Sequence, residues 1–431
     1  MSEQPLPKTE AASNGRAAGH RTGRRWGAVA AATTAIILVG AYSGAVGLAP
    51  LPELQPTLAV PAEQEISADE TAVSAVADGQ EAPSGVGFVD SALSWASDDE
   101  THEIASLTKL VTALVGLEEQ PIAAGETGPT YTVTEADDEI RDRVLQDNGV
   151  VEDAPAGLEL TARQMLELIL MPSANNYAIS YAEWVFGSEA AFVEAAAAWA
   201  EREGLESLRI VDPTGLSEQN LASAADLVQL GRLALEHPVV AEIVAQSWVG
   251  VPGVGPIENS NPILGDEGVV GVKTGTTTTA GFNLVAAREA TVDGRPVTAV
   301  SVALGRADDD ARAADSRTML DEALSTVQQA ELLTSGTIVG SVVVWDGTAV
   351  PLVSAAGATA VLIPGETATL TTELGALSAD PAGSVVGGIT VATPTGKEQV
   401  RVVTDDAVEE PDFWWRFTHP AIVFGWTSPA A

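Results

Sequence analysis

The hydrophobic pattern of the chain opens with one continuous apolar stretch, Gly27–Leu48, which holds no charged residue over 22 positions. A helix of about 20 apolar residues is long enough to cross the hydrocarbon core of a membrane. The residues before it are basic, and the positive charges nearest to it are Arg21, Arg24 and Arg25. Because basic flanks stay inside the cell, the pattern predicts a cytoplasmic segment 1–26, a single-pass anchor 27–48 in the cell membrane and an extracytoplasmic remainder.

A cleaved signal peptide is the alternative interpretation of the same stretch, because Ala45 and Gly47–Ala49 offer small residues at a possible cleavage point. The arginine-bearing head and the length of the apolar run favour retention as an anchor. Residues 49–69 follow, and they are rich in proline, alanine and acidic side chains. This composition predicts a linker that is stiffened by proline and charge.

Residues 70–327 contain both helical and strand patterns of hydrophobic residues. Apolar residues at helical spacing predict a largely buried helix at Ala105–Glu118 and further helices at Leu160–Leu170, Ser188–Arg202, Ala222–Glu236 and Asp310–Thr326. Short β-rich runs predict strands at Gly85–Asp90, Ala92–Ala96, Val269–Thr276, Gly281–Arg288 and Arg295–Leu304. The combination predicts a mixed α/β domain in which helices cover an antiparallel sheet.

The last quarter of the chain is dominated by short strands. Residues 331–405 contain β-rich runs at Val342–Trp345, Val350–Val353, Ala360–Ile363, Thr367–Thr371 and Gly388–Val391. They predict a small all-β domain. The tail 406–431 is aromatic but too short and too interrupted to span a membrane. We expect it to pack against the body, and contact with the membrane interface is the alternative.

Charge and composition exclude several classes of function. The formal net charge is −39, and a surface this acidic repels phosphate backbones, so no nucleic-acid partner is expected. The chain has no cysteine, which excludes disulfides and thiolate metal sites. It also lacks an H-E-x-x-H pattern or similar arrangement. We therefore expect no metal site and no cofactor.

Three short motifs carry the candidate chemistry, and they follow one another along the chain: Ser106-Leu107-Thr108-Lys109, Ser173-Ala174-Asn175 and Lys273-Thr274-Gly275. This trio, with S-D-N as the usual middle form, marks acyl-transferring serine enzymes that react with penicillin. Each motif alone occurs by chance in many proteins. Their order along the chain and the sequences that flank them make the combination specific.

Lysine usage strengthens the case. The chain has only four lysines, at positions 8, 109, 273 and 397, among 21 basic residues. Two of the three lysines that follow the apolar stretch therefore lie inside the motifs. An ammonium loses its proton when it is desolvated, whereas a guanidinium does not. Lysine therefore persists where the reaction requires an amine.

The spacing of the first motif suggests how it works. Ser106 and Lys109 are three residues apart, so on a helix both point the same way and the amine can reach the hydroxyl. Burial of this helix and the like charge of Lys273 both lower the pKa of Lys109. A neutral Lys109 can then act as general base while Ser106 attacks a carbonyl and forms an acyl-enzyme.

The chain resembles the serine D-Ala-D-Ala carboxypeptidases, which are low-molecular-weight penicillin-binding proteins, from about residue 70 to 325. The closest stretches are IASLTKLVTALVGLE, LILMPSANNYA, DPTGLSEQNLASAADL and GVKTGTTTTAGFNLVAA. The resemblance implies a β-lactamase/transpeptidase-like catalytic domain at 70–327, followed by the β domain. It also implies a peptidoglycan stem peptide ending in D-Ala-D-Ala as substrate and β-lactams as covalent inhibitors.

The resemblance also assigns roles to the remaining motif residues. It implies that Ser173 relays a proton to the leaving D-alanine and that Asn175 holds a backbone amide of the substrate. Lys273 and Thr274 would bind the terminal carboxylate, and Gly275 would let the strand approach the ligand closely. It further implies an oxyanion hole formed by the amides of Ser106 and Thr276. A cap of a helix is the structural alternative for Ser173 and Asn175.

Two other functions stay open at this point. A penicillin-binding receptor that is acylated but barely turns over would suit a span, a linker and an acylatable domain. Its cytoplasmic part, however, has only 26 residues and no room for a signalling module. A β-lactamase is the other alternative, although no Glu-x-x-x-Asn pattern lies between Asn175 and Lys273.

Overall fold

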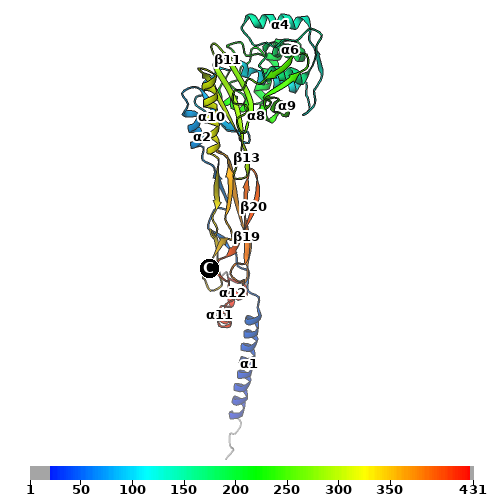
Figure 1. Ribbon diagram of the computed structural model, residues 1–431. Helices are drawn as coiled ribbons and strands as arrows, with labels where there is room; N and C mark the ends of the chain where they lie inside the picture. Colours follow the sequence, from blue (N-terminus) through cyan, green and yellow to red (C-terminus); the bar gives the residue numbers. More distant parts are fainter. Residues whose placement is uncertain (1–19, 428–431) are drawn as a thin grey trace, which may run out of the picture.

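A computed structural model describes residues 20–427 and shows a long, narrow molecule (Figure 1). The helix α1 (His20–Leu48) projects at one end, and a domain of strands forms the middle. The large domain lies at the far end, where α4 (Glu135–Gln146) is outermost (Figure 1). Within the described residues, Trp26–Leu48 of α1 is the one helical stretch long and apolar enough to cross a membrane. The expected cytoplasmic segment lies mostly outside the described residues, which begin at His20.

The large domain is built on a five-stranded sheet in the order β11-β12-β13-β3-β4. Its strands are β11 (Val269–Thr277), β12 (Gly281–Val292), β13 (Arg295–Arg306), β3 (Ser84–Phe88) and β4 (Ser94–Ala96). Each neighbouring pair is antiparallel. The predicted mixed domain with an antiparallel sheet is confirmed.

Both faces of this sheet are buried, because alternate residues of one strand join different cores. Leu284 and Ala286 of β12 pack into a cluster with α2 (Thr71–Asp78) and α10 (Asp309–Ser325). Their neighbours Val285 and Ala287 pack into the larger helical cluster on the other side. Side chains alternate between faces along a strand, so helices must cover both.

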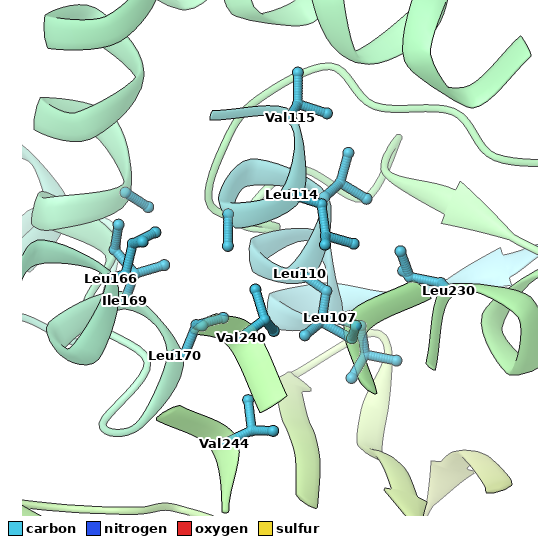
Figure 2. Packing of buried hydrophobic residues seen from close by; sticks show 14 of the residues in the cluster. Leu107, Leu110, Leu114, Val115, Leu166, Ile169, Leu170, Leu230, Val240 and Val244 are labelled. Carbon is cyan, nitrogen blue, oxygen red and sulfur yellow. The ribbon is translucent and has the colours of Figure 1, made fainter. Parts of the chain in front are cut away.

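The nucleophile helix lies at the centre of the helical cluster. The short turn Ala105–Leu107 leads into α3 (Thr108–Glu119), in which every residue from Thr108 to Leu117 is buried. Figure 2 shows Leu110 and Leu114 of α3 among apolar side chains from α5 (Ala162–Leu170), α8 (Ala224–Glu236) and α9 (Pro238–Val244). A side chain packed on all sides keeps one rotamer, so this core fixes where α3 presents its first turn.

The remaining elements of the large domain surround this core. They are β5 (His102–Glu103), β6 (Thr130–Thr132), β7 (Glu159–Thr161), α6 (Asn175–Phe186), α7 (Glu189–Arg202), β8 (Leu221–Ala222), β9 (Trp248–Val251) and β10 (Gly255–Glu258). Neither α4 nor α6 was expected from the hydrophobic pattern. Helix α4 is strongly polar and buries only Asp137, Ile140 and Val144, so its periodic signal is weak.

The β domain has its own core and a seven-stranded sheet in the order β1-β15-β16-β20-β19-β18-β2. Its elements are β1 (Thr57–Leu58), β2 (Glu63–Ser67), β14 (Gln328–Leu333), β15 (Ile338–Val343), β16 (Ala349–Ser354), β17 (Ala358–Leu362), β18 (Thr367–Leu374), β19 (Val385–Thr393) and β20 (Gly396–Thr404). The all-β character expected of residues 331–405 matches this arrangement, although β14 and β20 were not foreseen.

The expectation of a linker at residues 49–69 is wrong. Strand β1 pairs with β15, and β2 pairs with β18, so this stretch supplies both outer strands of the seven-stranded sheet. Leu54 is buried in the core of the β domain and its backbone pairs with Leu377. The outer strands expose one edge and alternate side chains to solvent, so a polar, proline-containing sequence is compatible with them.

The aromatic tail packs against the end of α1. It forms α11 (Phe413–Thr418) and α12 (Pro420–Val423) beside the C-terminal end of that helix (Figure 1). The hydroxyl of Tyr42 donates to the carbonyl of Phe417 at 2.7 Å, and the two rings meet edge to face. The guanidinium of Arg416 donates to the carbonyl of Ala49 at 2.9 Å. The tail therefore contacts α1, and Trp415 and Ile422 also pack against the core of the β domain, which is the contact with the body that we expected.

Candidate active site

Ser106 lies in a strained turn just before α3. Ala105 has φ +49, a left-handed conformation that costs a non-glycine residue free energy. The hydroxyl of Thr108 donates to the carbonyl of Ala105 at 2.8 Å and helps to hold this turn. Strain that the surroundings maintain is common where a side chain must be presented at one fixed place. Ser106 is thereby held at the start of α3, half-buried, with Lys109 one turn later.

The amine of Lys109 is completely buried and has three oxygen partners. Its Nζ lies 2.9 Å from Oγ of Ser106, 2.5 Å from Oδ1 of Asn175 and 2.7 Å from the carbonyl oxygen of Thr214. A carbonyl oxygen only accepts hydrogen bonds. When the amine is neutral, its two N–H groups therefore donate to Asn175 and Thr214. Its lone pair is then left for the proton of the Ser106 hydroxyl.

The surroundings favour this neutral form. Burial lowers the pKa of Lys109 well below its usual value, and the positive charge of Lys273 lowers it further. The carboxylate of Asp212 acts in the opposite direction and raises the pKa of Lys109, but burial dominates. A buried amine with a lowered pKa can take a proton from a hydroxyl. The predicted pairing of Ser106 with Lys109 is present in the geometry.

The second motif lies at the start of α6, and both of its polar residues are buried. Ser173 has φ +70, and among the residues that the structure describes none hydrogen-bonds to its Oγ. Asn175 is the first residue of α6 and accepts a hydrogen bond from Lys109. This contact was not foreseen from the sequence, which assigned Asn175 to the substrate alone. Neither Ser173 nor Asn175 caps the helix through its side chain, because no side-chain cap is present at α6.

The third motif occupies the edge strand β11. Lys273 is 1% exposed, and its Nζ donates to the carbonyl of Thr274 at 3.0 Å. Burial, aided by the charge of Arg312, lowers the pKa of Lys273 to about 7. The hydroxyls of Thr274 and Ser260 lie 2.6 Å apart. The ammonium group of Lys273 therefore loses its proton easily when no anion is present to stabilise the positive charge.

Gly275 has a different partner from the one that the sequence suggested. A Cβ at this position would lie 2.9 Å from the carbonyl oxygen of Ile104, 3.0 Å from the amide nitrogen of Ser106 and 3.2 Å from that of Leu107. A close approach that needs glycine is therefore present between β11 and the nucleophile turn. This approach brings the turn that carries the amide of Ser106 against the segment of β11 that directly precedes Thr276.

Arg312 is a site residue that the sequence analysis missed. It belongs to α10, is 6% exposed, and its Nη1 donates to Oγ1 of Thr276 at 3.1 Å and to the carbonyl of Asn283 at 3.1 Å. Its guanidinium also lies over the ring of Phe282. No local motif marks this arginine, because it reaches β11 from a helix 36 residues further along the chain. Thr214 was missed for another reason, since only its backbone carbonyl contacts Lys109.

His102, the histidine nearest to Ser106 along the chain, forms no competing centre with it. His102 is 2.9 Å from Asp98, on the surface, and it forms no hydrogen bond with Ser106. Within residues 20–427 no cluster of histidine and carboxylate side chains is arranged to hold a metal ion. The constellation around Ser106 is thus organised for acyl transfer by a serine with a lysine base.

The family profile described as D-alanyl-D-alanine carboxypeptidase matches residues 91–306, which contain every motif residue and the whole of the site except Arg312. This chain belongs to the D-alanyl-D-alanine carboxypeptidase family. The match covers half of the chain and includes four strands of the five-stranded sheet, β4, β11, β12 and β13, whereas β3 precedes it.

Curated relatives have two related activities. A D-alanyl-D-alanine endopeptidase of Pseudomonas aeruginosa is 36% identical over 146 residues, which is 32% of this chain and 42% of the relative. The D-alanyl-D-alanine carboxypeptidase DacD of Escherichia coli is 27% identical over 267 residues, covering 59% of this chain and 65% of the relative. The chain thus spans about two fifths to two thirds of the length of these relatives.

Solved structures show the same fold. Penicillin-binding protein 5 of Haemophilus influenzae superposes with a TM-score of 0.52 at 22% identity, covering 76% of this chain and 97% of that one. The DD-transpeptidase of Streptomyces K15 gives a TM-score of 0.51 at 20% identity, covering 56% and 96%. At these identities the likeness establishes the fold alone.

Proposed function

We propose that this chain is a serine DD-carboxypeptidase that removes the terminal D-alanine from peptidoglycan stem peptides through an acyl-enzyme. The observation that carries the proposal is the buried amine of Lys109, 2.9 Å from Oγ of Ser106 and held by two carbonyl acceptors. A structural lysine would be paired with a carboxylate, whereas this one contacts only neutral oxygens. Such an amine is suited to removing a proton from the serine hydroxyl.

The geometry supports one sequence of bond changes. Oγ of Ser106 attacks the carbonyl of the penultimate D-alanine while its proton passes to Nζ of Lys109. The amides of Ser106 and Thr276 stabilise the negative charge on the carbonyl oxygen. The C–N bond then breaks, and the proton held by Nζ of Lys109 passes to the leaving amine through the hydroxyl of Ser173, which has no hydrogen-bond partner among the described residues. Water hydrolyses the ester and restores Ser106.

The carboxylate at the end of the substrate requires a cationic pocket. Lys273, the hydroxyl of Thr274 and the guanidinium of Arg312 gather along β11 and provide it. A carboxylate bound beside Lys273 favours its protonated form and raises its pKa from about 7. The substrate therefore stabilises the charge that binds it. β-Lactams, which also carry a carboxylate next to a reactive amide, would acylate Ser106 in the same way.

The test is a stem pentapeptide ending in D-Ala-D-Ala, incubated with the full chain in detergent. We expect release of D-alanine by the wild-type protein and none by Ser106→Ala. Intact mass after exposure to penicillin should show one adduct on the wild type and no adduct on the variant. Adduct on Ser106→Ala, or no release of D-alanine by an acylated wild type, would contradict the proposal.

An endopeptidase that cleaves D-alanyl cross-links is the second candidate, because some curated relatives carry that name. The same assay with a cross-linked muropeptide dimer distinguishes it, since cleavage of the dimer without release of D-alanine from the pentapeptide would favour the endopeptidase. Rapid hydrolysis of the penicillin adduct would indicate a β-lactamase. A stable adduct without any peptide cleavage would indicate a receptor.

We further propose that α1 is retained as a membrane anchor, with everything after it outside the cytoplasm. The support is the exposed apolar surface of Trp26–Leu48 and the packing of α11 against its C-terminal end. Fractionation of cells and N-terminal sequencing of the mature chain test this proposal. A soluble product that begins near Ala49 would show instead that the segment is a cleaved signal peptide.

A further inference from the structure

The loop Asp212–Asn220 is organised around one carboxylate. Oδ1 of Asp212 accepts hydrogen bonds from the amides of Thr214 at 2.7 Å and Gly215 at 2.8 Å, and from the Thr214 hydroxyl at 2.5 Å. Oδ2 accepts from the amide of Ser217 at 3.0 Å and from Nδ2 of Asn220 at 2.7 Å. Five donors thus converge on one side chain, so an uncharged replacement cannot satisfy all of them.

The same loop contacts helix α3 at two places and the turn before this helix at a third. The carbonyl of Thr214 accepts from Lys109 at 2.7 Å, and the neighbouring carbonyl of Pro213 accepts from the hydroxyl of Thr112 at 2.7 Å. A Cβ on Gly215 would lie 1.8 Å from the carbonyl oxygen of Ala105, so the loop backbone lies directly against the strained turn before Ser106. A shift of this loop would therefore move an acceptor of the base and the support of the nucleophile together.

We propose that Asp212 is a positioning residue for acylation: it fixes the Thr214 carbonyl so that the lone pair of Lys109 faces the Ser106 hydroxyl. The inference rests on the proposed acyl-enzyme function. Asp212 does not contact Ser106 in the described residues, and it acts through the loop. Without the carbonyl in place, the amine can rotate, and the hydroxyl loses its aligned base.

Asp212 also acts through its charge. Its carboxylate raises the pKa of Lys109, against the lowering by burial and by Lys273 on β11. The carboxylate of Asp212 also contributes to raising the pKa of Glu189 at the start of α7, after the larger effect of burial. Removal of the Asp212 charge therefore lowers the pKa of Lys109, and the acid limb of the acylation rate should move to lower pH.

The experiment measures the second-order rate constant for acylation of the full chain by a fluorescent penicillin as a function of pH. Asp212→Asn keeps the shape but loses the charge and at least two acceptor contacts. We expect its plateau rate to fall at least about tenfold, with the acid limb at lower pH. Asp212→Glu keeps the charge but displaces it by one methylene. It should lose a similar factor on the plateau while its acid limb stays near that of the wild type.

Asp226→Asn is the matched control, because Asp226 also holds a loop through the amide of Ser207 at 2.8 Å and its hydroxyl at 2.6 Å, away from Lys109. Thermal denaturation of all variants accompanies the kinetics. A plateau within a few-fold of the wild type in Asp212→Asn overturns the inference. So does a loss that is equal at every pH and matched by Asp226→Asn. If the wild type itself is not acylated, the proposed function fails instead.

Discussion

Lys109 illustrates how a single side chain is made reactive by its neighbours. A protonated lysine has three donors, and here it meets three oxygens, of which two belong to carbonyl groups and one to the serine. The charged form could therefore be hydrogen-bonded, but burial and Lys273 both oppose it. Because the carbonyl groups cannot donate, loss of the proton frees the lone pair toward Ser106 and toward no other group.

Replacement of Lys109 by arginine should abolish acylation although the positive charge is kept. A guanidinium stays protonated in proteins and cannot act as base. General-base assistance contributes about 10²–10⁴-fold, so we expect a loss of at least about a hundredfold in the rate of acylation by a fluorescent β-lactam. Lys273→Arg is the comparison, because a guanidinium still binds a carboxylate. A Lys109→Arg variant that is folded and reacts within a few-fold of the wild type would contradict the assignment of the base.

The two lysines also predict the pH dependence of turnover. Lys109 must be neutral, so kcat/KM rises with pH through the lowered pKa of Lys109. Lys273 must be charged to bind the carboxylate, so kcat/KM falls as pH rises above about 7. Because bound substrate raises the pKa of Lys273, kcat should stay flatter than kcat/KM on the alkaline side. In Lys273→Arg the alkaline limb should disappear, and a wild-type kcat/KM that is constant from about pH 7 to 9 would refute this account.

At the scale of elements, the site lies where the edge strand β11 meets the turn at the start of helix α3. Strand β11 supplies Lys273 and the amide of Thr276, and the turn before α3 supplies Ser106. The packing of α3 among α5, α8 and α9 fixes one side, and the ladder from β11 to β12 fixes the other. Gly275 sets the distance between them, since its missing side chain leaves room for the backbone of the turn.

A methyl group at position 275 should therefore damage catalysis more than folding. In Gly275→Ala the Cβ would press on backbone atoms of Ile104, Ser106 and Leu107, which cannot move aside as a flexible side chain can. Displacement of a reacting group by about 1 Å costs roughly 10²-fold, so we expect acylation to fall by about that factor. Overpacking should cost about 1–3 kcal/mol of stability, as measured by chemical denaturation.

Gly250→Ala in β9 is the control for this prediction, because the nearest atom to its Cβ would be on the ring of Trp248 at 4.0 Å. We expect acylation by Gly250→Ala at the rate of the wild type. If Gly275→Ala also keeps the wild-type rate, the contact between strand and turn does not control the position of the nucleophile.

At the scale of the whole molecule, the site lies in the large domain, which the β domain separates from the apolar helix α1 (Figure 1). The β domain joins the large domain through a buried ion pair, in which Arg295 donates to both carboxylate oxygens of Glu366 at 2.6 and 2.7 Å. Arg295 also donates to the carbonyl of Val361, and Ile363 packs into the core between α2, α10 and the sheet. These contacts connect the β domain to β13 and to the core of the large domain.

Loss of the carboxylate at this junction should be costly. Glu366→Gln removes the carboxylate that is paired with the guanidinium of Arg295, whose side chain is 10% exposed, and leaves only the weaker influence of Asp90. Breaking a buried pair from one side typically costs about 3–5 kcal/mol, which chemical denaturation of the full chain in detergent would detect. The exposed pair of Arg202 and Glu118 provides the control, and Glu118→Gln should change stability by at most about 1 kcal/mol. Equal losses in the two variants would show that the junction is not specially stabilised.

Local sequence was sufficient for much of this architecture. The run without charges at Gly27–Leu48, the alternation in β12 and β13 and the helical spacing in α3 each determine which face of an element is buried. The three motifs identified the chemistry, because a serine three residues before a lysine lies on the same helix face. The polar helix α4 and the outer strands β1 and β2 were missed, since solvent covers enough of them to erase the pattern.

Tertiary structure alone decided which groups complete the site. The carbonyl of Thr214 carries no side-chain signature, and Arg312 arrives from a helix that follows the motifs. The sequence singled out Gly275, but only the fold showed that its backbone lies against the nucleophile turn. Residues 54–67 join the β domain because strand pairing across more than 280 residues is set by the core that forms between them. Sequence determines which faces seek burial, whereas the packed fold determines which distant groups meet there, because that choice depends on all the contacts at once.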